Sequence, residues 1–279
     1  MRISTTDYFD LRLTLNSGQL FHWKEESPGI FIIIKNNTVL RIRQENNFEI
    51  RLNQYGNMVT KNEIIKLIGL NNQSTIQNIL SKDPLVNSLI ANYRGLTIMC
   101  QDPYECLISF ISSSMSNIPR IMLNLKNLRK MGNSIIDGTS EYLFPSAQQI
   151  VSLGENKLRK IGFGYRAKYI IQTCKKIIRE KIDFQSWQNK SDEELKLDLM
   201  NFSGVGNKIA ECVMLFGFER SRSFPIDVWM KRAIFALKPN LRELTNEELC
   251  IWGKSRWKEN AGLVQQILYT AIRSGKIPN

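Results

Sequence analysis

The hydrophobic pattern of this chain changes its period near residue 60. Before that point apolar and polar residues alternate, as in Val39–Arg43 and Phe48–Leu52, which is the period of a half-buried strand. Asn36 and Asn37, which follow the apolar run 31–35, are typical of a hairpin turn. Beyond residue 60 apolar residues recur every three to four positions, as they do in amphipathic helices.

We therefore expect an α+β protein of two domains. Residues 1–98 are expected to form an N-terminal antiparallel β-sheet domain with flanking helices, and residues 99–279 a larger all-α domain. Helical periodicity is found beside the predicted strands at residues 64–68 and 76–80.

Two Asp-Pro pairs predict helix starts, because Asp is a favoured N-cap and Pro fits the first turn. One helix is expected from Pro84 to about Tyr93, and another over residues 104–114. Further helices are expected over residues 119–131, 155–161, 164–181, 191–200, 207–217, 228–237, 245–252 and 260–274.

The charge of the chain points to a polyanionic partner. Its 279 residues include 38 Lys and Arg and 26 Asp and Glu, a net charge of +12. Residues 1–98 hold 11 basic and 8 acidic side chains (net +3), which leaves 27 and 18 (net +9) for the rest. An excess of positive charge on one domain is typical of proteins that bind nucleic acid, although other basic proteins are common.

Several other classes are excluded by composition. No apolar run approaches the ~20 residues of a membrane-spanning helix, so no membrane partner is expected. Residues 1–10 are polar and lack the apolar stretch of a secretory signal, which predicts a protein of the cytoplasm and nucleoid, or of the nucleus in a eukaryote. Five scattered cysteines without a C-x-x-C pair argue against a disulfide framework or a closed zinc site, and His22 is the only histidine.

Residues 199–212, Leu-Met-Asn-Phe-Ser-Gly-Val-Gly-Asn-Lys-Ile-Ala-Glu-Cys, form the most specific segment. One helix is expected to end near Met200 and another to begin near Asn207, with a tight turn at Gly204 and Gly206. This spacing is typical of a helix-hairpin-helix motif, in which glycines allow a close backbone approach and free N–H groups bind a phosphate. A plain helical hairpin is the alternative, but the sequence around the glycines favours DNA binding.

Two charged residues near this hairpin predict chemistry. Lys208 lies in the first turn of the second helix, where the helix dipole favours the neutral amine that nucleophilic chemistry requires. Cys212, four residues further on, shares its face of the helix. Asp227 is the expected N-cap of a helix from Val228, a position that stabilises an ionised carboxylate. A fixed anion beside a nucleophilic lysine suits the stabilisation of a sugar cation during cleavage of a glycosidic bond.

With these residues the chain resembles the helix-hairpin-helix DNA glycosylase superfamily, and more specifically the 8-oxoguanine DNA glycosylases of the eukaryotic type. The resemblance covers nearly the full length. Four further segments, in the family's order, support it: residues 15–23, 101–111, 162–169 and 261–269.

The resemblance implies a bifunctional enzyme that bends duplex DNA and flips the damaged nucleotide into a pocket. Lys208 is then implied to attack C1′ of the deoxyribose and expel the base, while Asp227 stabilises the developing cation. The resulting imine acidifies the C2′ proton, and β-elimination nicks the strand. The implied partner is duplex DNA that contains oxidised guanine, bound by a monomer.

The resemblance also assigns residues to the excised base. Gly18 matches a glycine whose carbonyl accepts the N7–H that 8-oxoguanine has and guanine lacks. Gln265 matches a glutamine at the pairing edge of the base, Tyr269 an aromatic residue that stacks on it, and Cys212 the residue on its opposite face. Taken alone, Gln265 would be interpreted as a solvated side chain, and Tyr269 and Cys212 as core residues.

Other positions are implied to contact the strand opposite the lesion. Tyr165 matches a wedge, and Arg166 and Arg120 match donors to the opposite cytosine, although either arginine could instead contact phosphate. Met115 departs from the family, because it stands in place of an asparagine that helps to read that cytosine. A thioether cannot donate a hydrogen bond, so the preference for the opposite base is left open.

The remaining assignments concern phosphate and cations. Gly204, Gly206 and Ile209 match positions whose backbone N–H groups hold phosphate, and Trp229 replaces a phosphate-binding histidine, for which its indole N–H could substitute. A cation at the hairpin carbonyls is possible but not required, and no cofactor or metal is expected. Only Cys250 lies in the last 60 residues, so the iron–sulfur cluster of some relatives is not expected.

Two alternatives remain open at this stage. The first is a glycosylase of the same superfamily that removes a different damaged base; Gly18 and Gln265 argue against it. The second is a helix-hairpin-helix DNA-binding protein without catalysis; Lys208 and Asp227 argue against that.

Overall fold

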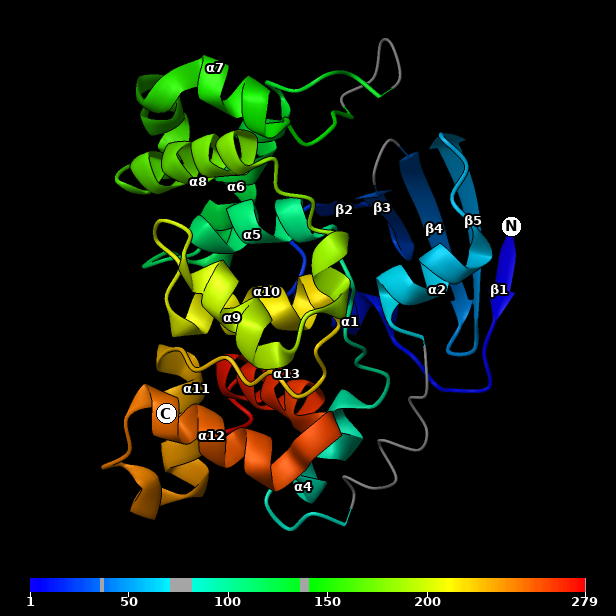
Figure 1. Ribbon diagram of the computed structural model, residues 1–279. Coiled ribbons are helices and arrows are strands. Elements are labelled where there is room, and N and C mark those ends of the chain that lie inside the picture. Colours follow the sequence, from blue (N-terminus) through cyan, green and yellow to red (C-terminus); the bar gives the residue numbers. More distant parts are fainter. Residues whose placement is uncertain (36–37, 71–81, 136–140, 279) are drawn as a thin grey trace.

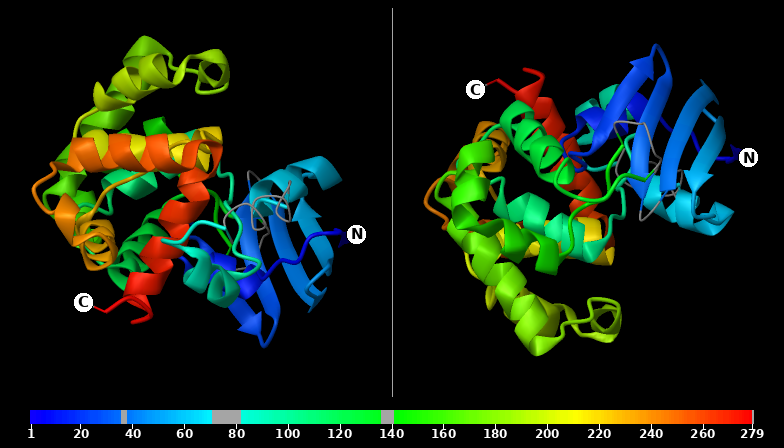
Figure 2. Two further views of the ribbon diagram at one scale, coloured as in Figure 1. Left: turned by 90° about the horizontal axis from the view of Figure 1, so that it is seen from below. Right: turned by 90° about the horizontal axis from the view of Figure 1, so that it is seen from above.

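The computed structural model describes residues 1–35, 38–70, 82–135 and 141–278 of the chain. An antiparallel sheet at the N-terminus lies beside a larger helical body (Figures 1 and 2), which confirms the predicted α+β class. The predicted turn at Asn36 and Asn37, and the helical periodicity at 76–80, lie outside the described residues.

The sheet has five strands in the order β1-β5-β4-β3-β2, all antiparallel. Successive residues of the strand β3 face opposite sides of the sheet. Phe31 and Ile33 face a core that the sheet shares with the two helices α1 and α2, whereas Ile32 and Ile34 pack on Ile135 on the other side. Because both faces of β3 are covered, its sequence is apolar throughout. The elements are β1 (Arg2–Ser4), α1 (Leu11–Asn16), β2 (Trp23–Ser27), β3 (Ile30–Lys35), β4 (Thr38–Asn46), β5 (Glu49–Gly56) and α2 (Lys61–Ile68).

The helical body contains two hydrophobic cores. One is built around α5 to α10 and the other around α11 to α13. Its elements are α4 (Asn87–Ile90), η1 (Ala91–Tyr93), α5 (Pro103–Ile111), α6 (Ile118–Arg129), α7 (Ala147–Leu158), η2 (Arg159–Phe163), α8 (Arg166–Glu180), η3 (Ser186–Asn189), α9 (Asp192–Met200), α10 (Asn207–Phe218), α11 (Val228–Leu237), η4 (Pro239–Leu241), α12 (Asn246–Trp257), η5 (Lys258–Asn260) and α13 (Ala261–Arg273).

The prediction that a helix begins at Pro84 is wrong. Asp83 does not cap a helix at Pro84, because its carboxylate accepts hydrogen bonds from Leu85 N at 2.8 Å, from Arg256 Nη2 at 2.9 Å and from Trp257 Nε1 at 2.9 Å. The helix α4 begins only at Asn87.

The bounds predicted for the helix over 155–161 are also wrong. Ser146 and Gln149 form a capping box that starts α7 at Ala147, and Gly154, with φ +74°, interrupts the helix. The segment that follows Leu158 is the π-turn η2.

The predicted boundary between the two domains, at residues 98 and 99, stays a prediction. Val86, Leu89 and Tyr93, which precede it, pack in the core of α11 to α13 and not against the sheet. Within the described ranges, no helix is long and apolar enough to cross a membrane.

Candidate active site

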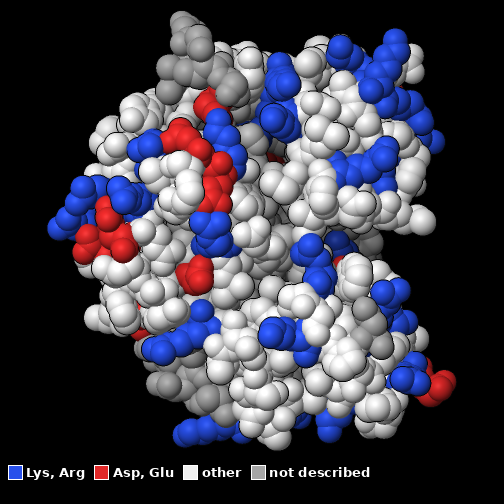
Figure 3. Space-filling model, turned by 180° about the vertical axis from the view of Figure 1, so that it is seen from behind, with Lys and Arg blue, Asp and Glu red and all other residues white. Residues whose placement is uncertain are grey.

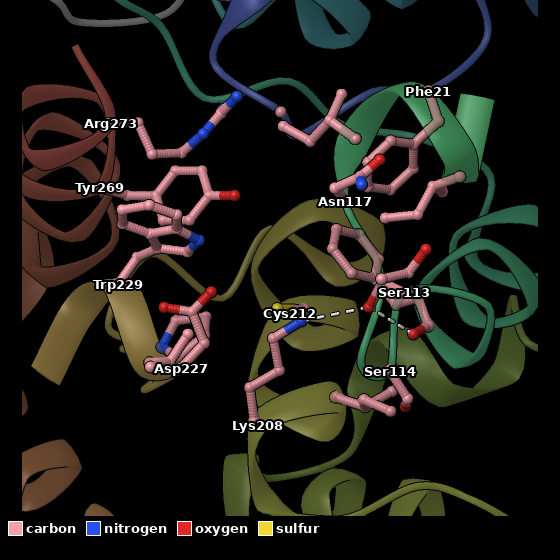
Figure 4. Close-up of a pocket in the computed structure, with 18 of the residues that line it drawn as sticks. Phe21, Ser113, Ser114, Asn117, Lys208, Cys212, Asp227, Trp229, Tyr269 and Arg273 are labelled. Carbon is pink, nitrogen blue, oxygen red and sulfur yellow. Dashed lines mark hydrogen bonds between the residues drawn. The ribbon is translucent and has the colours of Figure 1, made fainter.

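A cavity of about 440 Å³ lies where the two helical cores meet the loop after α1. Its walls come from that loop, from residues 113–117 between α5 and α6, from the start of α6, and from α10, α11 and α13. In Figure 4, Lys208, Cys212 and Ser113 lie on one side of this space, and Asp227, Trp229, Tyr269 and Arg273 lie on the other. Eight of the predicted site residues line it: Gly18, Lys208, Ile209, Cys212, Asp227, Trp229, Gln265 and Tyr269.

The hairpin that carries Lys208 is formed by α9 and α10. Gly204 has φ +79°, and a Cβ there would come within 2.7 Å of the Tyr169 ring, so both the backbone and the space require glycine. Gly206 is the N-cap of α10, and it has open space around it and no side-chain cap. The N–H groups of the first turn of α10 are therefore available to an anion, as the sequence predicts for this motif.

Lys208 projects from the first turn of α10 toward the end of α5. Its Nζ donates a hydrogen bond to Ser113 Oγ at 3.2 Å and lies 5.4 Å from the centre of the Phe110 ring. The side chain is half-buried and lines the cavity. The amine is thus held at the wall of an enclosed space, where it can meet a bound electrophile.

Asp227 is the N-cap of α11, as predicted. Its Oδ1 accepts a hydrogen bond from Met230 N at 2.8 Å. Asp227 also lines the cavity, and its other carboxylate oxygen has no hydrogen-bond partner among the described residues. The segment before it is fixed by Glu211 of α10, which is 1% exposed and accepts from Phe224 N at 3.0 Å. Glu211 also pairs with Lys254 at 2.6 Å and Lys196 at 3.2 Å. One buried carboxylate therefore ties the Asp227 segment to the helix of Lys208.

Cys212 lies one turn after Lys208 and is buried. Burial raises the pKa of its thiol to about 11, an effect that nearby Lys208 opposes and Asp227 adds to. The group is a neutral thiol at ordinary pH, and it presents a polarisable apolar surface to the cavity.

The helix α13 contributes Gln265 and Tyr269 from one face. Gln265 is 5% exposed, and among the described residues its Oε1 has no hydrogen-bond partner. A buried amide oxygen without a partner costs free energy, unless a ligand supplies the missing donor. Burial raises the pKa of Tyr269 to about 12, and Arg273 lies over its ring at 5.3 Å.

Gly18 lines the cavity beside α13, with φ +84°. A Cβ at this position would lie 2.6 Å from Ile118 Cδ1 and 3.4 Å from Tyr269 Cε1. Only glycine fits both the backbone conformation and the space.

The residues predicted to contact the opposite strand are not gathered in the cavity. Arg166 is buried, and its guanidinium donates to the carbonyl of Ser114 at 2.5 Å and to that of Met115 at 2.7 Å. Met115 is 92% exposed with φ +45°, and Tyr165 beside it is also exposed. Arg120 is exposed on α6, beside a separate hollow. Their predicted roles remain predictions; the structure shows Arg166 as a support of the Met115 loop.

Other predicted and unpredicted residues complete the walls. Trp229 lines the cavity, and Arg232 lies 5.0 Å from its ring centre. Ile209 also lines it, although it is buried in the core of α5 to α10. The sequence interpretation missed Ser113 and Arg273. Arg273 follows Tyr269 by four residues and shares its helix face, a spacing that could have revealed it.

The charges are unevenly spread over the surface. On the face drawn in Figure 3, Lys and Arg side chains occur over both halves of the molecule, whereas Asp and Glu gather mainly on one side. Such a face suits a polyanion. Among the described residues, no group of three or more His, Cys, Asp or Glu side chains could hold a metal ion.

A hairpin lysine and an N-cap aspartate at one cavity are features of a DNA glycosylase site, and comparison with known families agrees. Residues 1–107 match the family described as 8-oxoguanine DNA glycosylase, N-terminal domain. Residues 109–251 match the HhH-GPD superfamily base excision DNA repair proteins. The chain belongs to this superfamily, among the N-glycosylase/DNA lyases.

Similar proteins match most or nearly all of the chain. An N-glycosylase/DNA lyase of Saccharomyces cerevisiae is 32% identical over 82% of this chain and 70% of its own length. A probable N-glycosylase/DNA lyase of Methanothermobacter thermautotrophicus is 28% identical over 99% and 97%.

Solved structures agree as well. MBOgg1 in complex with a low-affinity DNA ligand has a TM-score of 0.92 at 30% identity, over 99% of this chain and 96% of the other. The Clostridium acetobutylicum 8-oxoguanine glycosylase/lyase, in complex with DNA that contains cytosine opposite 8-oxoguanine, has a TM-score of 0.88 at 25% identity, over 99% of both chains.

Proposed function

We propose that this protein excises 8-oxoguanine from duplex DNA and then cleaves the strand at the damaged nucleotide. The observation that carries the proposal is one cavity lined by an amine, a carboxylate, a buried amide oxygen without a partner in the described chain, and a glycine that no other residue could replace. These are Lys208, Asp227, Gln265 with its Oε1, and Gly18.

The reaction begins when the flipped nucleotide enters the cavity. The amine of Lys208 attacks C1′ of the deoxyribose, and the bond from C1′ to the base nitrogen breaks with its electron pair leaving on the base, which takes up the proton that Nζ loses. The Asp227 carboxylate stabilises the positive charge that develops on the sugar. After the sugar ring opens, C1′ and Nζ form an imine. Water takes a C2′ proton, the electrons of that C–H bond form a C2′–C3′ double bond, and the 3′ phosphate leaves with the electron pair of its C3′–O bond. A second water then hydrolyses the imine and frees Lys208.

Base recognition is assigned to three walls of the cavity. The Gly18 carbonyl accepts the N7–H of 8-oxoguanine, which guanine lacks, and Gln265 bonds the pairing edge. Tyr269 and Cys212 offer surfaces on the two faces of the base. The 440 Å³ volume is large enough for a purine, which supports this assignment.

The partner is duplex DNA, and every group that this scheme requires comes from a single chain, so we assign the activity to a monomer. The scheme uses no cofactor, and a cation at the hairpin carbonyls is not needed for it. The protein acts in the compartment that holds the DNA. We assign phosphate contacts to Gly204, Gly206, Ile209 and Trp229.

Reading of the opposite strand is assigned to Arg120, Tyr165 and Arg166. In this proposal Arg166 must release the carbonyls of Ser114 and Met115, or act through them, since both now accept from its guanidinium. Because Met115 has no donor, opposite-base preference rests on the two arginines.

The test is borohydride trapping on duplexes that carry 8-oxoguanine opposite each of the four bases. Borohydride reduces the imine and leaves a covalent protein–DNA band, so only an imine-forming enzyme is captured. We expect a band with wild-type protein and none with Lys208→Gln. Trapping opposite all four bases would show relaxed reading, and trapping opposite cytosine alone would show that Arg120 and Arg166 suffice.

Two results would contradict the proposal. If only an unmodified abasic site is trapped, the protein is a lyase of this superfamily that acts on another lesion. If neither substrate is trapped although the duplex binds, the protein binds DNA without catalysis.

A further inference from the structure

The loop that carries Gly18 is held through hydrogen bonds to the carbonyls of the residues before and after Gly18. Gln266 Nε2 of α13 donates to the Ser17 carbonyl at 2.7 Å, and Gln101 Nε2 donates to the Gln19 carbonyl at 2.6 Å. The Gly18 carbonyl between them accepts no hydrogen bond in the described part of the chain. The carbonyls of the residues on either side of Gly18 are therefore both held, while Gly18, at the cavity wall, keeps its own carbonyl as a free acceptor in the described chain.

The Gln19 side chain anchors the same loop to the segment before α5. Its Oε1 accepts from Met99 N at 2.7 Å, and its Nε2 donates to the Thr97 carbonyl at 2.8 Å. These bonds fix the loop relative to residues 97–101, but not relative to α13. Among the described residues, the bond from Gln266 to Ser17 is the one hydrogen bond that joins this loop to α13.

That bond is placed where it affects the base site. Gln266 is 2% exposed and follows Gln265 directly, and Tyr269 lies on the same helix. The bond therefore sets the spacing between the Gly18 carbonyl on one wall and the Gln265 amide on the other. A shift of this spacing by a fraction of an ångström would weaken two base contacts together.

We infer that Gln266 is a positioning residue for lesion recognition, which sets the distance between the Gly18 carbonyl and the base-contacting face of α13. This inference rests on the proposed function. It predicts that the two reactions of the enzyme depend differently on Gln266. Excision of 8-oxoguanine needs the spacing, whereas cleavage of an abasic site does not, because that substrate has no base to contact Gly18 or Gln265.

The experiment compares wild type with Gln266→Met, which keeps the length of the side chain and removes the donor. Single-turnover rates are measured for 8-oxoguanine excision and for cleavage of a preformed abasic site. We expect the excision rate to fall about tenfold, since the Ser17 carbonyl loses its partner, and abasic-site cleavage to stay within about twofold. The matched control is Tyr93→Phe, which removes a part-buried hydrogen bond to Ser274 just after α13; neither residue lines the cavity. It should change neither rate.

A second variant separates loss of the hydrogen bond from a folding defect. Gln266→Glu keeps the shape, but the ionised carboxylate cannot donate to Ser17, whereas the protonated carboxyl can. Its excision rate relative to wild type should therefore rise as the pH falls. Abasic-site cleavage by Gln266→Glu, relative to wild type, should not change over the same pH range, whereas a structural defect relieved by protonation would slow and restore both reactions.

The outcomes are distinct. Equal loss of both rates in Gln266→Met, or no loss in either, overturns the inference while wild-type excision still supports the proposed function. Failure of wild type to excise 8-oxoguanine, with abasic-site cleavage intact, overturns the proposed lesion and the inference with it.

Discussion

The Nζ of Lys208 donates a hydrogen bond to Ser113 Oγ at 3.2 Å, and the same hydroxyl donates to the Phe110 carbonyl at 2.7 Å. Since its one proton is used on Phe110, the Ser113 hydroxyl can only accept from the amine. The acceptor therefore has a fixed direction, and it holds the proposed nucleophile at the wall of the cavity (Figure 4).

Ser113→Ala should slow both chemical steps to a similar extent. A hydrogen bond of this kind contributes about 1 kcal/mol, which corresponds to a rate reduction of roughly fivefold. Single-turnover excision and abasic-site cleavage should fall together, because Lys208 serves both steps. Unchanged rates in a folded Ser113→Ala protein would show that the amine is positioned by other contacts.

Asp227 combines a structural and a catalytic role that two substitutions can separate. Asp227→Asn keeps a good N-cap for Met230 N but removes the charge, so the melting temperature should hold while excision falls at least about 100-fold. Asp227→Ala should lose excision and also about 1 kcal/mol of stability. Thermal melts and single-turnover rates test this, and near-normal excision by Asp227→Asn would remove the carboxylate from the mechanism.

Gln265→Ala should lower excision of 8-oxoguanine more than it lowers duplex binding. The amide contacts only the flipped base in the proposed complex, whereas affinity for the duplex comes mainly from phosphate contacts. Abasic-site cleavage should be unaffected. Binding titrations at fixed salt and single-turnover rates provide the comparison, and an equal loss in both would reassign Gln265 to general binding.

Local sequence predicted those parts of the site that neighbouring residues determine. The turn at Gly204 and Gly206 and the N-cap at Asp227 depend on backbone conformation and capping within a few residues. Gln265 and Tyr269 share a face because they are four residues apart on one helix. The predicted α+β division followed from the change of hydrophobic period for the same reason.

Contacts between segments that are far apart in the sequence could not be predicted from local patterns. Lys208 and Ser113 are 95 residues apart, and Ser17 and Gln266 are 249 apart, so no local spacing relates them. The late start of α4 has the same origin, because Asp83 binds Arg256, 173 residues away. Arg166 was assigned from resemblance, and its burial under the Met115 loop could be learned only from the structure.

The buried carboxylate of Glu211 should be important for stability. Glu211→Ala leaves Lys196, Lys254 and the N–H of Phe224 without their acceptor, which should cost about 3–5 kcal/mol of unfolding free energy. Glu259→Ala is the control, because its pair with Arg222 is exposed and should contribute at most about 1 kcal/mol. Urea denaturation measures both, and similar values for the two variants would contradict the burial argument.

His22 should make folding sensitive to mild acid. Burial and the nearby cations Arg129, Lys24 and Lys126 lower its pKa well below the ordinary value of 6.5. A lowered pKa means that the unfolded state binds the proton first. The stability that neutral His22 contributes is therefore present above pH 6.5 and is lost as the pH falls toward the folded pKa, by at most about 1.4 kcal/mol per pH unit. Denaturation midpoints between about pH 5 and 7 should show a slope that His22→Asn reduces, because this histidine is the only one in the chain. An identical slope in wild type and His22→Asn would mean that His22 is accessible to the proton in the folded protein and that carboxylates alone cause the acid sensitivity.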